Sequence, residues 1–147
     1  MSVVRKGRKE PLVVLDTNIL ISYLWGSVHC LRIVRAMLLE NRFTPAVTPE
    51  IIGEFDDVVS RPRIKRQIGE ITPAIFKREY LLFARMVHPR ERVKICDDSD
   101  DNILLECAQA ADAEYIVTGD DDLLRLKKFG TVKIVTPADF IREFLEG

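Results

Sequence analysis

The chain has 147 residues, of which 47% are hydrophobic and 31% are charged, and its formal net charge is −1. This size and composition predict one soluble globular domain, spanning 1–147, with a substantial core. No apolar run approaches the roughly 20 residues of a membrane-spanning helix, and a net charge near zero gives no overall signal for nucleic-acid binding.

The sequence begins with a basic arm, residues 1–10, and the apolar run that follows is too short for a signal peptide. The cysteines are odd in number and form no C-x-x-C pair, and with two isolated histidines they make no zinc pattern. We therefore expect a reduced, cytoplasmic protein in which these side chains pack in the core or lie on the surface. They are Cys30, Cys96, Cys107, His29 and His88.

Short apolar runs alternate with segments of helical periodicity along the chain. The first run, LVVLD at 12–16, is apolar up to its final aspartate, as in a strand buried on both faces. Further strands are expected at 43–47, 93–96, 114–118 and 132–135, the last at the sheet edge. The expected helices are 18–25, 28–41, 49–59, 73–87, 100–112, 123–128 and 137–145. Strands that alternate with helices favour a parallel sheet covered on both faces.

Three of these helices are expected to begin at a Thr-Pro pair, namely Thr48-Pro49, Thr72-Pro73 and Thr136-Pro137. A threonine side chain can accept a hydrogen bond from a free N–H group of the first helical turn. Proline at the first helical position loses no hydrogen bond. The pairs therefore predict where these helices start.

Acidic residues are concentrated in one part of the chain. Ten of the 23 acidic residues fall between Asp97 and Asp122, a window that holds no Lys or Arg. Carboxylates that crowd together repel one another unless a cation lies among them. The acidic window therefore indicates a site for a hard divalent metal ion.

Two predicted strands place acidic side chains at one edge of the sheet. Asp16 is the last residue of the first strand, and Asp120 lies two residues beyond the strand that ends at Thr118. In open α/β sheets, ligands bind in the crevice at the carboxyl ends of the strands. If the two strands are neighbours, the two carboxylates meet there.

Two predicted helices carry further acidic residues beside their apolar faces. In helix 100–112, Asp101 shares a face with the apolar stripe, but Asp100 lies about as close, so geometry does not choose between them. In an earlier helix, Glu54 and Asp56 border opposite edges of the stripe, so periodicity does not single out Glu54. Four carboxylates at a strand-end crevice suit Mg²⁺ or Mn²⁺, which prefer oxygen ligands and assist phosphodiester cleavage.

Four segments together resemble the PIN-domain (PilT N-terminal) ribonucleases, and most of all the toxin components of toxin–antitoxin systems. The segments are VVLDTN, EIIGEF, DDNILLECA and VTGDDDLL, and the closing VTPADFI at 135–141 is common in that subgroup. The resemblance runs from about Leu12 to Phe144. It implies an α/β fold, a three-layer α/β/α sandwich with a parallel sheet of four or five strands. It also implies cleavage of single-stranded RNA with Mg²⁺ or Mn²⁺, often by a homodimer, and raises the expectation of a cognate antitoxin.

The resemblance also assigns roles position by position. It implies four catalytic acids, which are Asp16, Glu54, Asp101 and Asp120. The implied metal ligands are Asp16, Asp101, Asp120 and Asp122, with Asn18 and Thr118 in supporting positions. The motif spacing to Ala108 favours Asp101 over Asp100. For Asp122, a metal ligand and a helix cap are equally compatible with the sequence.

The basic run at 61–66 has two interpretations. Its side chains can contact RNA phosphates, or the run can be an ordinary solvent-exposed loop. The residues concerned are Arg61, Arg63, Lys65 and Arg66.

Other functional classes share parts of this pattern. A signalling receiver domain also has acids at strand ends, but it needs an acid pair after its first strand, and LVVLD ends in one acid. A non-catalytic module that binds RNA or a protein partner is the alternative to a ribonuclease. The complete set of acids argues against that alternative.

Overall fold

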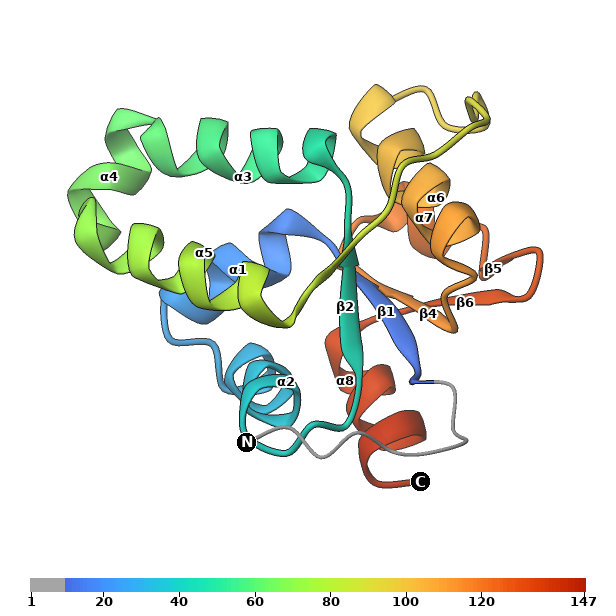
Figure 1. Ribbon diagram of the computed structural model, residues 1–147, viewed down its shortest axis with the longest axis horizontal. Helices are drawn as coiled ribbons and strands as arrows, with labels where there is room; N and C mark the ends of the chain where they lie inside the picture. The colour runs from blue at the N-terminus through green and yellow to red at the C-terminus, as the bar shows by residue number, and fades with distance from the viewer. Residues whose placement is uncertain (1–9) are drawn as a thin grey trace.

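A mostly parallel sheet of six strands runs through the middle of the structure, in the order β3-β2-β1-β4-β6-β5 (Figure 1). Within this sheet, β5 runs antiparallel to β6 and the other pairs are parallel. The computed structural model describes residues 10–147, so the predicted N-terminal arm lies outside the described residues except for its last one. The strands are β1 (Leu12–Leu15), β2 (Thr44–Val47), β3 (Arg85–Met86), β4 (Tyr115–Val117), β5 (Lys128–Phe129) and β6 (Val132–Val135).

The central strand β1 is buried on both faces, as its continuous apolar run predicts. Successive side chains of a strand point to opposite faces of the sheet. Val13 and Leu15 pack in one core cluster, and Leu12 and Val14 pack in a second cluster on the other face. The strand is hydrogen-bonded to β2 on one side and to β4 on the other. The carboxyl end of β1 is therefore flanked by a strand on each side, and a site can form there.

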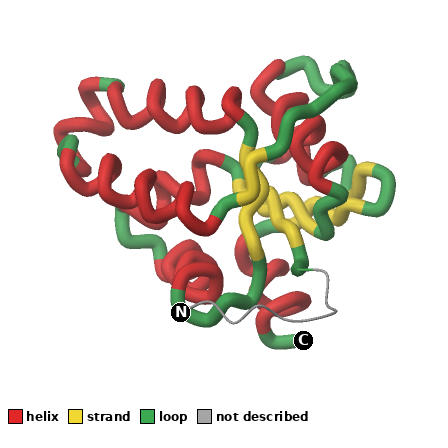
Figure 2. Tube along the Cα trace, viewed as in Figure 1, coloured by secondary structure: helices red, strands yellow, loops and turns green. Residues whose placement is uncertain are grey.

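Helices cover both faces of the sheet, which confirms the three-layer α/β/α architecture (Figure 2). One face packs against α1 (Thr17–Leu24), α2 (Val28–Leu38), α5 (Ile71–Phe83) and α8 (Pro137–Phe140), which continues as the π-helix η1 (Ile141–Leu145). The other face packs against α6 (Ser99–Ala111) and α7 (Asp121–Leu124). After β2, α3 (Pro49–Ser60) extends away from the sheet and the chain returns through α4 (Pro62–Ile68) and α5 (Figure 1). None of the helices within residues 10–147 is long and apolar enough to cross a membrane.

A short strand lies at each edge of the sheet, β3 at one and β5 at the other. A sheet of four or five strands is expected, and the structure has six. Four of them are the longer strands β1, β2, β4 and β6, and two are the short strands β3 and β5, of two residues each. Strand β6, predicted at the edge, has β5 outside it. The predicted helix 123–128 is wrong beyond α7, because residues 128–129 turn back to pair with β6.

The basic run 61–66 is helical, although the sequence analysis allows an ordinary loop there. Arg61 is extended, with a ψ of 135°, and Pro62 follows it as the first residue of α4. Proline ends α3 because it disfavours helical backbone in the preceding residue, and it starts α4 because its own φ suits a first helical position.

Two of the three predicted Thr-Pro helix starts are confirmed. The hydroxyl oxygens of Thr48 and Thr136 each accept a hydrogen bond, at 3.1 Å, from the backbone N–H three residues later. The third is wrong, because α5 begins at Ile71, before Thr72. Pro73 instead lies within the first turn, where a missing N–H leaves no hydrogen bond unmade.

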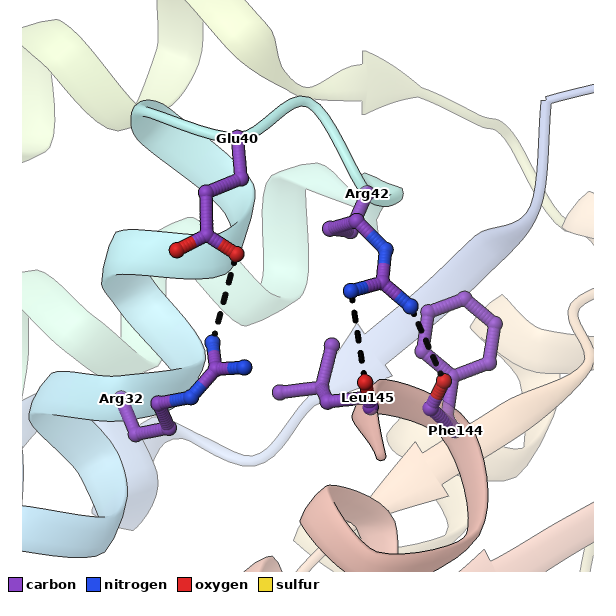
Figure 3. Close-up of polar contacts among 5 residues, drawn as sticks. All are labelled: Arg32, Glu40, Arg42, Phe144 and Leu145. Atoms are coloured by element: carbon purple, nitrogen blue, oxygen red, sulfur yellow. Dashed lines mark hydrogen bonds and ion pairs between the residues drawn. The ribbon is translucent and has the colours of Figure 1, made fainter. Parts of the chain in front are cut away.

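Arg42 ties the C-terminal helix to the chain segment that leads into β2 (Figure 3). Its guanidinium donates hydrogen bonds to the carbonyl oxygens of Phe144, at 3.2 Å, and Leu145, at 3.3 Å. It also lies 5.9 Å from the centroid of the Phe144 ring. The last carbonyls of a helix have no later turn to bond with, so Arg42 satisfies groups that would otherwise need water. The nearby Arg32–Glu40 ion pair, at 3.4 Å, is partly exposed and contributes little.

Candidate active site

Strands β1 and β4 are neighbours, and both lead to an acidic residue at the same edge of the sheet. Leu15 pairs with Val117 in parallel register. The backbone N–H of Asp16 extends this ladder by donating to the Val117 carbonyl oxygen at 3.0 Å. Asp120 follows shortly after Val117, where β4 has ended. The two strands are therefore neighbours, which is the arrangement expected to bring the carboxylates of Asp16 and Asp120 together.

Asp16 is buried, with 6% of its surface exposed, and its two carboxylate oxygens have different partners. Oδ1 accepts a hydrogen bond from the backbone N–H of Asn18 at 3.1 Å and so caps α1. Oδ2 accepts one from the Thr118 hydroxyl at 2.7 Å. Burial raises the pKa of Asp16, and the charges of Asp120 and Asp100 add to this, while the two hydrogen bonds lower it. Asp16 is thus both a helix cap and a member of the acidic cluster.

Thr118 connects the two strand-end acids. Its side chain is fully buried. The hydroxyl donates to Asp16 and accepts a hydrogen bond from the backbone N–H of Asp120 at 3.0 Å. One side chain therefore orients the carboxylate of Asp16 and fixes the backbone that presents Asp120.

We expect Thr118→Val to destabilise the protein by about 2–3 kcal/mol, because it leaves a buried carboxylate oxygen and a backbone N–H without partners at nearly unchanged side-chain volume. Urea unfolding measures the loss. Thr118→Ser retains the hydroxyl and should recover more than half of the stability. A valine variant as stable as the wild type, beside a destabilised serine variant, would show that the methyl group, and not the hydrogen bonds, is what matters.

Three carboxylates gather beside Asp16. One oxygen each from Asp101, Asp120 and Asp122 lies within 4.8 Å of the others. Asp101 is 4% exposed, and its buried Oδ2 has no hydrogen-bond partner among the described residues. Burial and the neighbouring carboxylate of Asp120 raise the pKa of Asp101 to about 7. A buried oxygen that lacks a donor and lies among like charges fits a bound cation.

The structure separates Asp100 from Asp101. Asp101 points inward from the first turn of α6 and belongs to the three-carboxylate group, whereas Asp100 is exposed. Asp100 still lies near the other acids, because its charge raises the pKa of both Asp16 and Glu54. Asp101 therefore has the geometry of a ligand, and Asp100 adds negative potential at the rim.

Of the two roles that the sequence left open for Asp122, the structure supports that of a metal ligand. Its carboxylate belongs to the three-carboxylate group, and its backbone N–H donates to Oδ1 of Asp120 at 2.9 Å in the cap of α7. The side chain is exposed and forms an ion pair with Arg125 at 3.5 Å. The cap of α7 is Asp120, so the carboxylate of Asp122 is not needed for capping.

Glu54 approaches the cluster from α3. It is half-buried, and the hydroxyl of Thr17 donates to its Oε2 at 3.4 Å. Burial raises the pKa of Glu54 to about 7, and the charges of Asp100 and Asp16 contribute. Asp56, which the sequence pattern did not separate from Glu54, is exposed and paired with Lys77 at 2.8 Å. The structure thus singles out Glu54 as the α3 acid that faces the cluster.

The basic residues of α4 are not brought to the acids. Helix α4 lies at the end of α3 that is remote from the sheet (Figure 1). Arg61 is paired with Asp57 at 3.3 Å, and Lys65 with Glu70 at 2.6 Å. Half of the residues predicted to contact RNA therefore already have acidic partners.

Two residues that lie near the acids, Thr17 and Cys96, were not among the predicted site residues. Thr17 is fully buried, and its hydroxyl donates a hydrogen bond to Glu54. Cys96 was interpreted as a packing or surface residue, yet the charges of Asp101, Asp122 and Asp120 add to the effect of burial in raising the pKa of its thiol. The position of Thr17 in the D-T-N motif was an available signal, whereas no spacing rule connects Cys96 to the cluster. Asn18, predicted to support the acids, does so through its backbone N–H.

The chain has similarities to known proteins. The solved structure of the PIN domain of human SMG5 is similar, with 19% sequence identity, a TM-score of 0.48, and coverage of 90% of this chain and 98% of that one. No curated protein sequence matches the chain. A family model described as PIN domain matches residues 12–122, a span that contains all the acids of the cluster. Because that match covers most of the sequence, the chain belongs to the PIN domain family.

Proposed function

We propose that this protein is an endoribonuclease that cleaves phosphodiester bonds of single-stranded RNA and requires Mg²⁺ or Mn²⁺. The observation that carries the proposal is the buried Oδ2 of Asp101, which lacks a hydrogen-bond donor and lies in the three-carboxylate group with Asp120 and Asp122. Membership of the PIN family, a fold generally associated with nucleases, supports the same function.

The residues of the site divide into those that would hold the metal ion and one that would transfer a proton. Asp101, Asp120 and Asp122 would hold the ion, with Asp16 beside them. When bound, the ion would orient and acidify a water molecule and stabilise the leaving oxygen. Glu54, whose pKa is raised to about 7 by burial, would accept a proton from an attacking water near neutral pH.

The chemistry of the donors favours hard cations. Every side chain in the group offers carboxylate oxygens, which suit Mg²⁺ and Mn²⁺. The thiol of Cys96, whose pKa is raised by burial and by the charges of the acidic residues, remains protonated at neutral pH. A protonated thiol is a poor ligand for a soft metal.

The resemblance to toxins of toxin–antitoxin systems extends the proposal to a cytoplasmic toxin with a cognate antitoxin. The proposal also includes assembly of the protein as a homodimer. Support for self-association comes from the outward face of α5, where Ile71, Ile75 and Leu82 are exposed. Light scattering on the purified protein tests the dimer, and inspection of the neighbouring reading frame tests for an antitoxin.

Cleavage of a mixed structured and single-stranded RNA by the wild type and by Asp16→Asn tests the function. We expect the wild type to cut with Mn²⁺ or Mg²⁺ and not with EDTA, and Asp16→Asn to lose at least ~100-fold in rate. Asp121→Asn removes an exposed acid next to the cluster and serves as the matched control, with near wild-type rate.

Three results would count against a nuclease. Equal cutting by the wild type and Asp16→Asn would identify a contaminant. Metal-independent cutting would exclude the proposed chemistry. RNA binding of equal affinity with and without metal, and no turnover, would instead identify the non-catalytic binding module.

A further inference from the structure

The segment between β3 and α6 has no regular secondary structure, but hydrogen bonds attach it to α6. The proposed RNA cleavage chemistry does not explain this attachment. Residues 88–96, here called the strap, climb alongside α6 toward its N-terminal end, as the yellow trace in Figure 1 shows. The sequence predicted a strand over part of it. Instead, its backbone bonds to two side chains of α6 that lie one helical turn apart, Asn102 and Glu106.

Glu106 holds the middle of the strap. It is a buried charged residue, 6% exposed, which is uncommon for a glutamate. Its Oε2 accepts a hydrogen bond from the backbone N–H of Val93 at 2.9 Å, and its Oε1 accepts one from the Arg92 guanidinium at 3.5 Å. Glu106 is thus one of the ten clustered acids, but its carboxylate binds the strap and takes no part in the three-carboxylate group.

Asn102 holds the upper end of the strap, next to the acidic cluster. Its Oδ1 accepts hydrogen bonds from the backbone N–H groups of Ile95, at 3.2 Å, and Cys96, at 2.8 Å. Its Nδ2 donates to the Cys96 carbonyl oxygen at 2.8 Å. Because Asn102 directly follows Asp101 in α6, these bonds fix residues 95–96 of the strap beside the proposed metal ligands.

The strap carries positive charge along α6, from Arg90 beside Gln109 and Ala110 at the C-terminal end of the helix toward the acidic residues at its N-terminal end. Arg90, Arg92 and Lys94 are exposed, and Glu91 is the sole acid between 88 and 96. Arg92 is paired with Glu106, but neither Arg90 nor Lys94 takes part in an ion pair within residues 10–147. In the basic run 61–66, by contrast, Arg61 and Lys65 are both paired with acids.

We propose that the strap is the surface along which the RNA backbone extends from the cleavage site, with Lys94 contacting the nearer phosphate and Arg90 one farther along α6. This inference rests on the proposed ribonuclease function and names the part of the chain that holds its substrate. A rigid cationic ridge suits this task, because the crowded carboxylates alone would repel a polyanion. Asn102 and Glu106 act as positioning residues, since their hydrogen bonds hold the ridge in place.

A pair of charge-reversal variants tests the proposal. Arg90→Glu/Lys94→Glu alters the strap, and Arg63→Glu/Arg66→Glu alters α4 by the same charge, at exposed positions without ion pairs among the described residues. Binding of a fluorescein-labelled single-stranded RNA is measured by anisotropy in EDTA over a range of salt concentrations. We expect the strap variant to bind at least ~10-fold more weakly, and its log–log salt slope to be smaller by about 1.4, or ~0.7 for each of two phosphates. The α4 variant tests the other basic segment that the sequence suggested for RNA contact, and if the strap binds the RNA it should change affinity less than ~2-fold.

A second pair tests the positioning role of Glu106. Glu106→Ala and Glu106→Gln remove the same negative charge, which by electrostatics alone would strengthen RNA binding. Glutamine keeps an acceptor for the Val93 N–H, so we expect it to bind RNA at least as well as the wild type. Alanine frees the strap and should weaken binding. In cleavage assays with Mg²⁺, Glu106→Ala should raise KM while kcat stays within ~2-fold.

The outcomes are distinct for the strap and for the nuclease. Unchanged RNA affinity in the strap variant, or an equal loss in the α4 variant, would overturn the strap proposal. So would a wild type that binds no RNA in EDTA. The nuclease proposal is decided separately by metal-dependent cleavage in the wild type, which can succeed while the strap proposal fails, and the anisotropy result does not require cleavage.

Discussion

Asp101→Asn is expected to abolish metal-dependent RNA cleavage and, at the same time, to make the metal-free protein more stable. The buried Oδ2 of Asp101 has no hydrogen-bond donor among residues 10–147, and burial together with Asp120 raises the pKa of this carboxyl to about 7. Its ionised form therefore destabilises the folded metal-free protein at pH values above neutrality. Asparagine has nearly the same shape, carries no charge and can donate a hydrogen bond to the Asp120 carboxylate.

Both parts of this prediction can be measured on one preparation. At about pH 8 in EDTA, we expect the variant to gain on the order of 1–2 kcal/mol, which corresponds to a rise in melting temperature of about 3–6 °C. Mg²⁺ or Mn²⁺ should raise the melting temperature of the wild type and have little effect on the variant. The cleavage rate should fall at least ~100-fold.

Asp100→Asn is the matched control for Asp101→Asn, because Asp100 is the exposed neighbour at the same helix end. It should retain both the response to metal and most of the activity. If Asp100→Asn lost the response and Asp101→Asn kept it, the assignment of the helical ligand would be reversed. A metal-free Asp101→Asn protein that is less stable than the wild type would contradict the account of the unpaired charge.

The second large effect concerns pH. The metal-free wild type is expected to lose stability as the pH rises from about 5 to about 8. The folded-state pKa values of Asp101 and Glu54 are both raised to about 7, whereas unfolded carboxyl groups titrate near ~4. Between these values the folded state holds more protons than the unfolded state. The stability that these two groups contribute is therefore complete below about pH 4 and is lost as the pH rises through 7.

Divalent metal should reverse this trend. Metal ions bind the deprotonated carboxylates, so the affinity for Mg²⁺ or Mn²⁺ should increase as the pH rises through 7. Thermal melts at several pH values, with EDTA or with metal, measure both effects. The double variant Asp101→Asn/Glu54→Gln removes the two groups and should flatten the pH dependence in EDTA. A wild type whose metal-free stability increases over the same pH range would refute the prediction.

The local pattern of the sequence was sufficient to predict much of the fold. The continuous apolar run before Asp16 predicted a strand buried on both faces, because hydrophobic side chains at every position require cover on two sides. Thr48 and Thr136 predicted helix starts through capping, which involves neighbours in the chain only. Where the local signal was ambiguous, the prediction was wrong. Residues 93–96 have strand-like apolar character, but their N–H groups bond to side chains of α6.

The acidic residues of the site were named from the sequence, but their arrangement could not be. Helical periodicity did not separate Asp100 from Asp101, since both lie near the apolar stripe within about 100° of rotation. The packing of α6 against the sheet buries Asp101 and leaves Asp100 exposed. Similarly, Glu54 and Asp56 differ because α5 supplies Lys77 to Asp56, while α1 supplies Thr17 to Glu54.

By itself, the sequence determined the layers of the fold, the family and the set of acids, because strand burial, capping and motif spacing are encoded by residues close together in the chain. The tertiary structure alone decided which carboxylates come together, which oxygen of Asp101 is left without a donor, and where the strap lies. These features depend on contacts between segments far apart in the sequence. Burial and charge proximity set the pKa of an acid, and both arise only when β1, β4, α3 and α6 pack together.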